Sequence, residues 1–253
     1  YPGHCPTEIL ASAEREEWER VARRVSGITA LAAEKQVGVL VDAEESWIQA
    51  PVDALTMQMM EQYNREKTIV YNTVQLYRKG RLSFLENCFE EARRKGFVLG
   101  VKLVRGAYME KERERAKALH VPSPIQDDKP ACDRDYDEAL KFGIQHIRGM
   151  AIIIATHNEQ SIAYAIRQMA ASGLPANHPH IRFSQLFGMS DNISFNLAKA
   201  GYPVSKYLPF GGVSDVIPYL LRRAEENTSV AGQTRRELAL IRKEIRRRRA
   251  YRI

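Results

Sequence analysis

The segment "FVLGVKLVRGAY" (Phe97 to Tyr108) runs from a buried strand into a polar cluster. Its first eight residues are apolar or glycine apart from Lys102, which is typical of a strand with a buried face. Lys102 and Arg105 carry charges that can hold an anion, Gly106 breaks the strand, and Tyr108 presents a flat ring. A purely structural strand would end in ordinary turn residues, so we expect this strand to end at a binding site.

Five other segments share this character: they are short, rich in Val, Ile, Leu and aromatic residues, and end in polar residues. They are "VGVLVDAEE" (37–45), "TIVYNTVQLY" (68–77), "MAIIIATHN" (150–158), "HIRFSQLFGM" (180–189) and "YPVSKYLPFGG" (202–212). Helical patterns lie between them, such as 82–96 with a closing Gly96 and "SDNISFNLAKAGYP" with Ser190 as N-cap. Strand and helix alternate without hairpins, which favours a parallel sheet.

A doubly wound sheet and a closed (β/α)8 barrel both fit this alternation. The polar clusters fall at the carboxyl ends of strands, where barrel active sites form, and no Gly-rich dinucleotide loop follows the first strand. Both observations favour the barrel. Six strands do not close it, and the residues before Val37 have a helical pattern, so we expect an α/β chain that lacks the first two βα units. The expected divisions are a helical segment 1–36, a barrel domain 37–232 and a basic helix or tail 233–253.

Composition places the chain among globular proteins and argues against several functions. Hydrophobic residues make up 44% and charged residues 27%, and no apolar run approaches the ~20 residues that span a bilayer. Cys5, Cys88 and Cys132 are widely spaced, which indicates a reducing compartment. The histidines form no metal-binding pattern, so we expect no metal site.

The positive charge is concentrated at the carboxyl end. Nine basic and two acidic residues follow Gln233, and they account for the whole net charge of +7. We therefore expect no nucleic acid partner for the body of the protein. In the tail, Leu238, Leu240, Ile241 and Ile245 recur at near-helical spacing. A solvated helix and a helix attracted to an anionic membrane both fit this pattern.

The segment "GVSDVIPYLLRRAEEN" predicts a helix with Ser214 as N-cap. Tyr219, Arg222, Arg223 and Glu226 fall at i, i+3, i+4 and i+7, which puts them on one stripe of that helix. The stripe is either a surface ion pair or a clamp in which the two guanidinium groups bind a substrate carboxylate.

Seven short motifs occur in an order that resembles one family. They are "DAEE" at Asp42, "VQLYRK" with Gln75, "KLVRGAY" at Lys102, "ATHN" with Thr156, "QLFGMSD" at Gln185, "KYLPFG" with Tyr207 and "YLLRRAEEN" at Tyr219. Together they resemble the proline dehydrogenase family, flavoenzymes with a distorted (β/α)8 barrel. The resemblance runs from about Val37 to Arg249. Strands of the family that precede Val37 carry a Lys and an acidic residue of its site.

The resemblance implies FAD as cofactor and oxidation of L-proline to Δ1-pyrroline-5-carboxylate. It also implies electron transfer to a membrane quinone, with a pyrroline-5-carboxylate dehydrogenase as a further partner. The implied location is the bacterial cytoplasm, peripheral at the inner membrane, or the matrix side of the mitochondrial membrane.

The site residues that the resemblance implies fall into two sets. Lys102 matches a basic residue near the flavin N5 edge, and the other cofactor contacts implied are Gln75, Val104, Gly106, Ala107, Tyr108, Thr156, His157, Asn158, Gln185 and Glu226. Gly106 is expected to permit close approach of the backbone to the cofactor. On the substrate side, Arg222 and Arg223 match the carboxylate clamp, and the implied pocket wall consists of Asp42, Leu186, Tyr207 and Tyr219.

Three other interpretations remain. A 4-hydroxyproline dehydrogenase of the same family should have a small residue in place of Tyr207. An inactive barrel fragment would act only as an interaction module and would be colourless. A metal-dependent hydrolase built on Asp42, Glu44 and His157 would lack the second histidine that such sites usually have.

Overall fold

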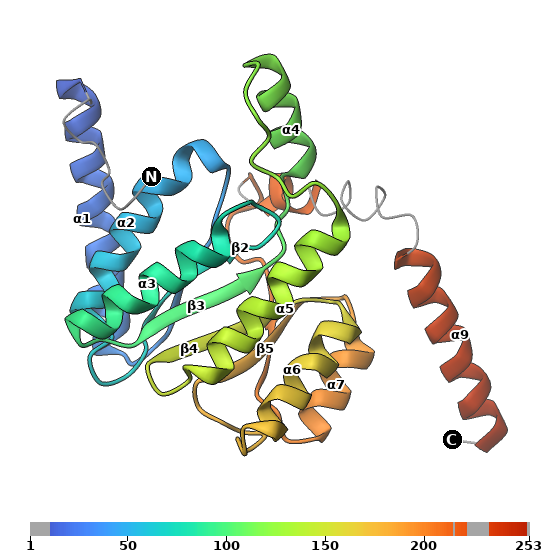
Figure 1. Ribbon diagram of the computed structural model, residues 1–253. Coiled ribbons are helices and arrows are strands. Elements are labelled where there is room, and N and C mark those ends of the chain that lie inside the picture. The colour runs from blue at the N-terminus through green and yellow to red at the C-terminus, as the bar shows by residue number, and fades with distance from the viewer. Residues whose placement is uncertain (1–10, 215, 222–232, 252–253) are drawn as a thin grey trace.

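Six parallel strands form one curled sheet in the computed structural model, which describes residues 11–214, 216–221 and 233–251 (Figure 1). Their spatial order follows the chain, and each neighbouring pair is parallel. The strands are β1 (Val39–Val41), β2 (Val70–Gln75), β3 (Leu99–Val104), β4 (Met150–Ala155), β5 (Ile181–Leu186) and β6 (Val204–Tyr207). The prediction of an α/β chain with six parallel strands is confirmed.

At least one helix lies in the chain between each pair of successive strands up to β6. These helices are α2 (Ser46–Tyr63), α3 (Arg81–Lys95), α4 (Met109–Ala118), α5 (Lys129–Gln145), α6 (Glu159–Ala171) and α7 (Asp191–Lys199). The helices α1 (Ser12–Glu34) and α9 (Gln233–Tyr251) lie outside this alternation, and residues 213–214 and 216–221 after β6 are also helical. The predicted closing glycine of α3 is present, because Gly96 adopts φ 72° and donates its N–H to the Ala92 carbonyl.

The main core fills the space between the sheet and these helices. In β3, Leu99, Val101 and Leu103 belong to this core, together with Tyr136 and Leu140 of α5. Because successive strand residues point to opposite faces, Gly100, Lys102 and Val104 point to the other face of the sheet. In β3, the residues available for a site are therefore Gly100, Lys102 and Val104.

Helix α1 packs onto the same core. Trp18, Ala22 and Val25 lie against it, and the buried Thr29 donates a hydrogen bond to the sulfur of Met59 in α2. The described part of segment 1–36 thus covers the outside of α2.

The two outer strands of the sheet are open on one side. Within the described residues, β1 pairs only with β2, and β6 pairs only with β5. The six strands therefore form part of a barrel wall, and the closed (β/α)8 barrel remains a prediction. In the part of the chain that the structure describes, no helix is long and apolar enough to cross a membrane.

Candidate active site at the carboxyl ends of the strands

The sheet brings six of the predicted site residues to one face and one end. Gln75, Lys102, Leu186 and Tyr207 occupy alternate positions that the main core does not use, and Asp42 continues the same alternation beyond β1. Leu186 is in register with Tyr207, and Gln75 is in register with Val104. Residues in register across parallel strands point to the same face, so these side chains gather at the carboxyl ends of the strands.

Lys102 forms an ion pair with Asp42 across this face. The Lys102 side chain is only 13% exposed, whereas that of Asp42 is 51% exposed. The more exposed Asp42 carboxylate therefore neutralises the nearly buried ammonium group of Lys102 from the solvent side of the site. Asp42 presents a carboxylate that a cationic amine can approach from solvent.

The side chain of Gln75 has a buried polar atom that no described residue hydrogen-bonds. The residue is 2% exposed, and its Nε2 donates hydrogen bonds to the carbonyls of Ala43 at 3.3 Å and Glu44 at 2.9 Å. Its Oε1 is buried without a hydrogen-bond partner. A buried acceptor of this kind is costly unless a donor meets it. A flavin ring N–H or ribityl hydroxyl group is such a donor, so Gln75 fits FAD.

Tyr108 and Gly106 end the strand that opens the sequence. The Tyr108 hydroxyl group donates a hydrogen bond to the Glu44 carboxylate, which joins the loop after β3 to the loop after β1. Gly106 has φ 143°, and a side chain there would overlap the ring of Tyr77. The glycine therefore makes room for a ring of its own protein, while Val104 and Ala107 beside it are half-buried.

Arg105 does not hold an external anion, contrary to the prediction. Its Nε pairs with Asp133 at 2.8 Å, and its Nη1 and Nη2 donate to Thr156 Oγ1 and Ser161 Oγ at 2.9 Å each. The guanidinium group also lies 4.3 Å from the centre of the Tyr136 ring. Arg105 thereby ties β3 to α5, β4 and α6.

Thr156 and Gln185 are held together by their own network. Gln185 donates from Nε2 to the Thr156 carbonyl at 3.4 Å and accepts from Ser194 Oγ at 2.9 Å. The Thr156 hydroxyl group receives the Arg105 bond and a second bond from the N–H of Asn158. Both side chains are buried, so the structure fixes their orientation tightly.

His157 lies beside Ser190 and Lys206. Its Nδ1 is 2.8 Å from Ser190 Oγ. Burial, with a smaller contribution from the Lys206 charge, lowers the pKa of His157 from 6.5 to about 4. The imidazole is therefore neutral near pH 7. Ser190 is the N-cap residue of α7, as predicted, but it has φ 51° and its hydroxyl group makes no side-chain capping hydrogen bond.

Asn158 has a structural task in the fold. Its Oδ1 accepts hydrogen bonds from the N–H groups of Gln160 at 2.8 Å and Ser161 at 3.3 Å, which caps α6. The turn after β4 thus sets the direction of α6.

Two of the predicted pocket-wall residues meet directly. The rings of Tyr207 and Tyr219 have centroids 5.5 Å apart and planes 43° apart. Leu186 lies in register beside Tyr207, so the three form one continuous apolar wall. Arg222, Arg223 and Glu226 lie outside the described residues. Among the residues described, no group of three or more His, Cys, Asp or Glu side chains is placed to hold a metal ion.

Three contacts of the folded chain were not predicted from the sequence. Arg105 donates to Thr156, Ser194 donates to Gln185, and Glu112 accepts from Ser46 at the start of α2. Their partners lie 9 to 66 positions away in the chain. No local sequence signal distinguished these contacts, because each partner is brought close only by the fold.

The parallel sheet and its polar carboxyl end define an α/β protein of the barrel type, with a candidate site on the face that the core helices leave uncovered. A family model for proline dehydrogenases matches residues 5–236, and the chain belongs to the proline dehydrogenase family. Among similar proteins, mitochondrial proline dehydrogenase 1 of Caenorhabditis elegans is 39% identical over 94% of this chain and 40% of its own length. Hydroxyproline dehydrogenase of Xenopus laevis is 41% identical over 95% of this chain and 52% of its own length.

A solved structure has a similar fold. Proline utilization A (PutA) from Bdellovibrio bacteriovorus superposes with a TM-score of 0.81 at 24% identity, over 88% of this chain and 23% of that one. The chain thus spans about half or less of the length of these relatives.

Proposed function

We propose that this chain forms most of the catalytic barrel of an FAD-dependent enzyme that oxidises L-proline to Δ1-pyrroline-5-carboxylate. The buried, unpartnered Oε1 of Gln75 carries the proposal for the cofactor, because it offers an acceptor where the family's flavin would lie. FAD would supply the hydride acceptor at N5. The residues of this chain would hold proline C5 against that atom and exclude water.

Each described part of the site has a task in this reaction. Lys102 and Asp42 place opposite charges at the carboxyl end of the sheet, and the Asp42 carboxylate can attract the cationic amine of proline. Tyr207, Tyr219 and Leu186 supply an apolar wall for the pyrrolidine ring. The further proposed cofactor contacts are Val104, Gly106, Ala107, Tyr108, Thr156, His157, Asn158, Gln185 and Glu226.

Arg222 and Arg223 are the proposed clamp for the proline carboxylate. Replacement of Arg223 with Met should raise KM for proline about a hundredfold or more, since a lost charge partner typically costs ~3–5 kcal/mol. Flavin content should fall less. Arg242→Met on α9 removes the same charge at an exposed position and should leave KM unchanged. A KM for Arg223→Met equal to that control would rule out the clamp.

Oxidation of 4-hydroxyproline is the second candidate, because a hydroxyproline dehydrogenase is among the similar proteins. Tyr207 favours proline in our proposal, since its bulk beside Tyr219 occupies the space a ring hydroxyl group would need. The ratio of kcat/KM for the two substrates distinguishes them.

Two further βα units complete the barrel in this proposal. The open sides of β1 and β6 support it, as do the exposed apolar side chains of Leu208, Phe210 and Val213 just beyond β6. A barrel of eight strands has no open edges, so additional strands would cover both.

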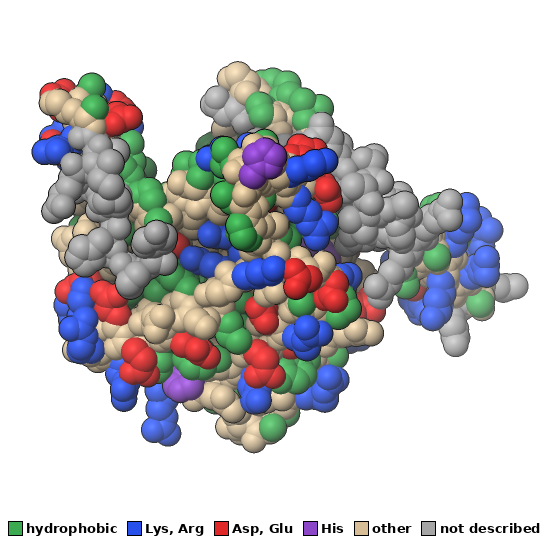
Figure 2. All heavy atoms as spheres, turned by 45° about the horizontal axis from the view of Figure 1, so that its top comes forward, with side chains coloured by type: hydrophobic (Ala, Val, Ile, Leu, Met, Phe, Trp, Pro, Cys, Tyr) green, Lys and Arg blue, Asp and Glu red, His purple; other side chains and the backbone are tan. Residues whose placement is uncertain are grey.

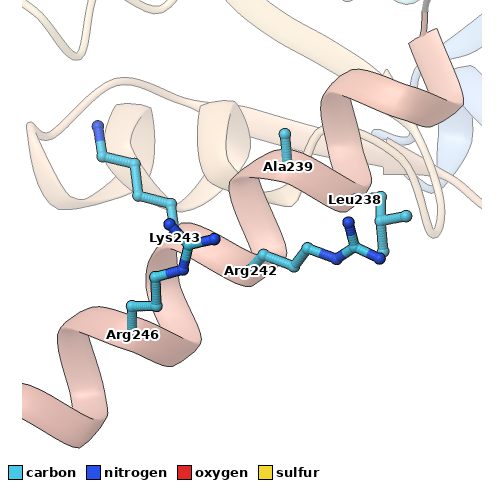
Figure 3. Close-up of a pocket in the computed structure, with 5 residues that line it drawn as sticks. All are labelled: Leu238, Ala239, Arg242, Lys243 and Arg246. Atoms are coloured by element: carbon cyan, nitrogen blue, oxygen red, sulfur yellow. The ribbon is translucent and has the colours of Figure 1, made fainter.

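The proposed electron acceptor is a membrane quinone, and a pyrroline-5-carboxylate dehydrogenase is the proposed consumer of the product. Helix α9 is the proposed contact with an anionic membrane. Leu238, Ile241 and Ile245 are exposed along it, and Lys and Arg side chains dominate its surface (Figure 2). Figure 3 shows the groove lined by Leu238, Ala239, Arg242, Lys243 and Arg246. All five residues belong to α9, so no second element closes the groove. An open groove of this kind suits contact with an extended surface, such as a membrane, better than enclosure of a small ligand.

A further inference from the structure

Glu112 is a buried carboxylate on a helix that is otherwise largely exposed and charged. Only 1% of Glu112 is exposed, whereas Lys111, Arg113 and Glu114 beside it are exposed. Removing a carboxylate from water is costly unless hydrogen bonds compensate for the lost hydration. Glu112 therefore needs strong partners, and α2 supplies them.

Both oxygens of Glu112 accept hydrogen bonds from one residue, Ser46. The Ser46 N–H donates to Oε1 at 2.6 Å, and the Ser46 hydroxyl group donates to Oε2 at 2.7 Å. Ser46 is the first residue of α2, and its N-cap residue Glu45 makes no side-chain capping bond. The first N–H groups of a helix have no partner within it, and a negative charge is favoured there. Glu112 thus caps α2 from another helix.

Further contacts join the same two segments, which are residues 108–115 around α4 and residues 44–47 at the start of α2. They are the Tyr108–Glu44 hydrogen bond, the Lys111–Glu45 ion pair, and the Arg115 guanidinium group 4.4 Å from the centre of the Trp47 ring. Exposed ion pairs contribute little by themselves. The buried bonds of Glu112 are therefore the main attachment.

Glu112 thereby anchors the loop of residues 42–45, which joins β1 to α2. This loop contains Asp42, which faces the candidate site. Strand β1 has three residues and, among those described, pairs only with β2, so it constrains the loop weakly. Gln75 holds the loop from one side through the carbonyls of Ala43 and Glu44. Glu112 holds it from the other side at Ser46.

We propose that Glu112 is a positioning residue: by capping α2, it holds Asp42 against Lys102 and Glu44 against Tyr108. The kinetic consequence rests on the proposed oxidation of proline, whereas the attachment rests on the contacts alone. The two parts therefore need separate readouts.

The chain offers its own reporter for the attachment. It contains two tryptophans, Trp18 in α1 and Trp47 beside Ser46, so Trp18→Phe leaves Trp47 as the only tryptophan, and its emission is excited at a wavelength that tyrosine does not absorb. In that background Glu112→Gln is compared with Glu114→Gln. Each variant removes one negative charge from α4, but only the first places an amide N–H₂ against the Ser46 donors. Thermal unfolding of both variants establishes that they fold.

Glu112→Gln should shift Trp47 emission to longer wavelength and increase its quenching by acrylamide. It should also raise KM for proline about tenfold with a smaller change in kcat, the effect of losing a buried hydrogen bond to a charged group. Ser46→Ala, which keeps the backbone bond, should fall between wild type and Glu112→Gln. Glu114→Gln should change neither readout.

Trp47 emission in Glu112→Gln that matches Glu114→Gln would overturn the attachment. A released Trp47 with unchanged KM would overturn the positioning role. A Trp18→Phe parent that does not oxidise proline, but releases Trp47 in Glu112→Gln, would overturn the proposed function and support the attachment.

Discussion

His157 lies in a largely buried position between Ser190 and Lys206, and this position determines its charge. In the folded protein the pKa of His157 is about 4, whereas its ordinary value is 6.5, because burial disfavours the charged form. Between these values the unfolded chain binds a proton that the folded protein does not. The free energy of unfolding should therefore decrease as the pH falls from 6.5 to about 4, by up to roughly 3 kcal/mol.

His157→Gln should flatten this pH dependence, since glutamine has no charge to gain and can still contact Ser190. Chemical denaturation at pH values between 4 and 7 measures the slope. The matched control is His120→Asn, because His120 is exposed and its φ of 53° is one that asparagine tolerates. A slope in His157→Gln equal to that of wild type would show that another group dominates the acid sensitivity.

For single residues, the sequence predicted which side chains follow the strands better than it predicted what those side chains contact. The motif with Asn158 marks the end of β4 correctly, but the cap that Asn158 places on α6 depends on the local turn. Arg105 was expected to meet an anion, and its guanidinium group is instead occupied by Asp133, Thr156 and Ser161. Its partners lie 28 to 56 positions away, so only the folded chain brings them together.

Among the elements, the strands were predicted most completely, because their apolar alternation and polar ends are local signals. All six are present, although each is shorter than its pattern, since the predicted ranges included the turns that follow. The tie between α4 and α2 was not predicted. Its carboxylate looks like any other charge in "MEKERERA" until the partner at Ser46 is known.

Helix α9 is the element that tests the proposed membrane contact. A chain that ends at Thr234 lacks the whole positive surplus of +7, and each basic residue near an anionic surface contributes ~1 kcal/mol. The truncated protein should therefore sediment less with anionic vesicles. Binding of the full chain should weaken with salt, because charges are screened beyond ~10 Å at 0.1 M.

A second variant separates apolar insertion from charge. Replacement of Leu238, Ile241 and Ile245 by Ser keeps every charge of α9 and removes its exposed apolar side chains. It should bind more weakly than wild type and more strongly than the truncated chain. Turnover with a soluble dye acceptor should be the same in all three proteins. Equal sedimentation of truncated and full-length chains would leave α9 as a solvated helix.

At the scale of the molecule, the fold explains why one face of the sheet carries the chemistry. The helices bury one set of alternate strand residues, and the other set carries Gln75, Lys102, Leu186 and Tyr207 to the carboxyl end. The alternation of strands and helices predicted that polar residues gather at the carboxyl ends of the strands, whereas these four residues were implied by the resemblance to the family. The six strands were expected to leave the barrel open, and within the described chain β1 and β6 each have a partner on one side only. The two further βα units that would close the barrel remain a prediction.

Reduction of bound flavin by proline is the decisive measurement for the proposed activity. The protein is loaded with FAD, freed of excess cofactor and mixed anaerobically with L-proline while the visible flavin absorption is followed. We predict that FAD stays bound, that L-proline bleaches the flavin band, and that 4-hydroxyproline does so more slowly. The Gln75→Leu variant, which removes the buried acceptor, should retain less flavin. A colourless protein, or a bound flavin that stays oxidised with both substrates, would contradict the account.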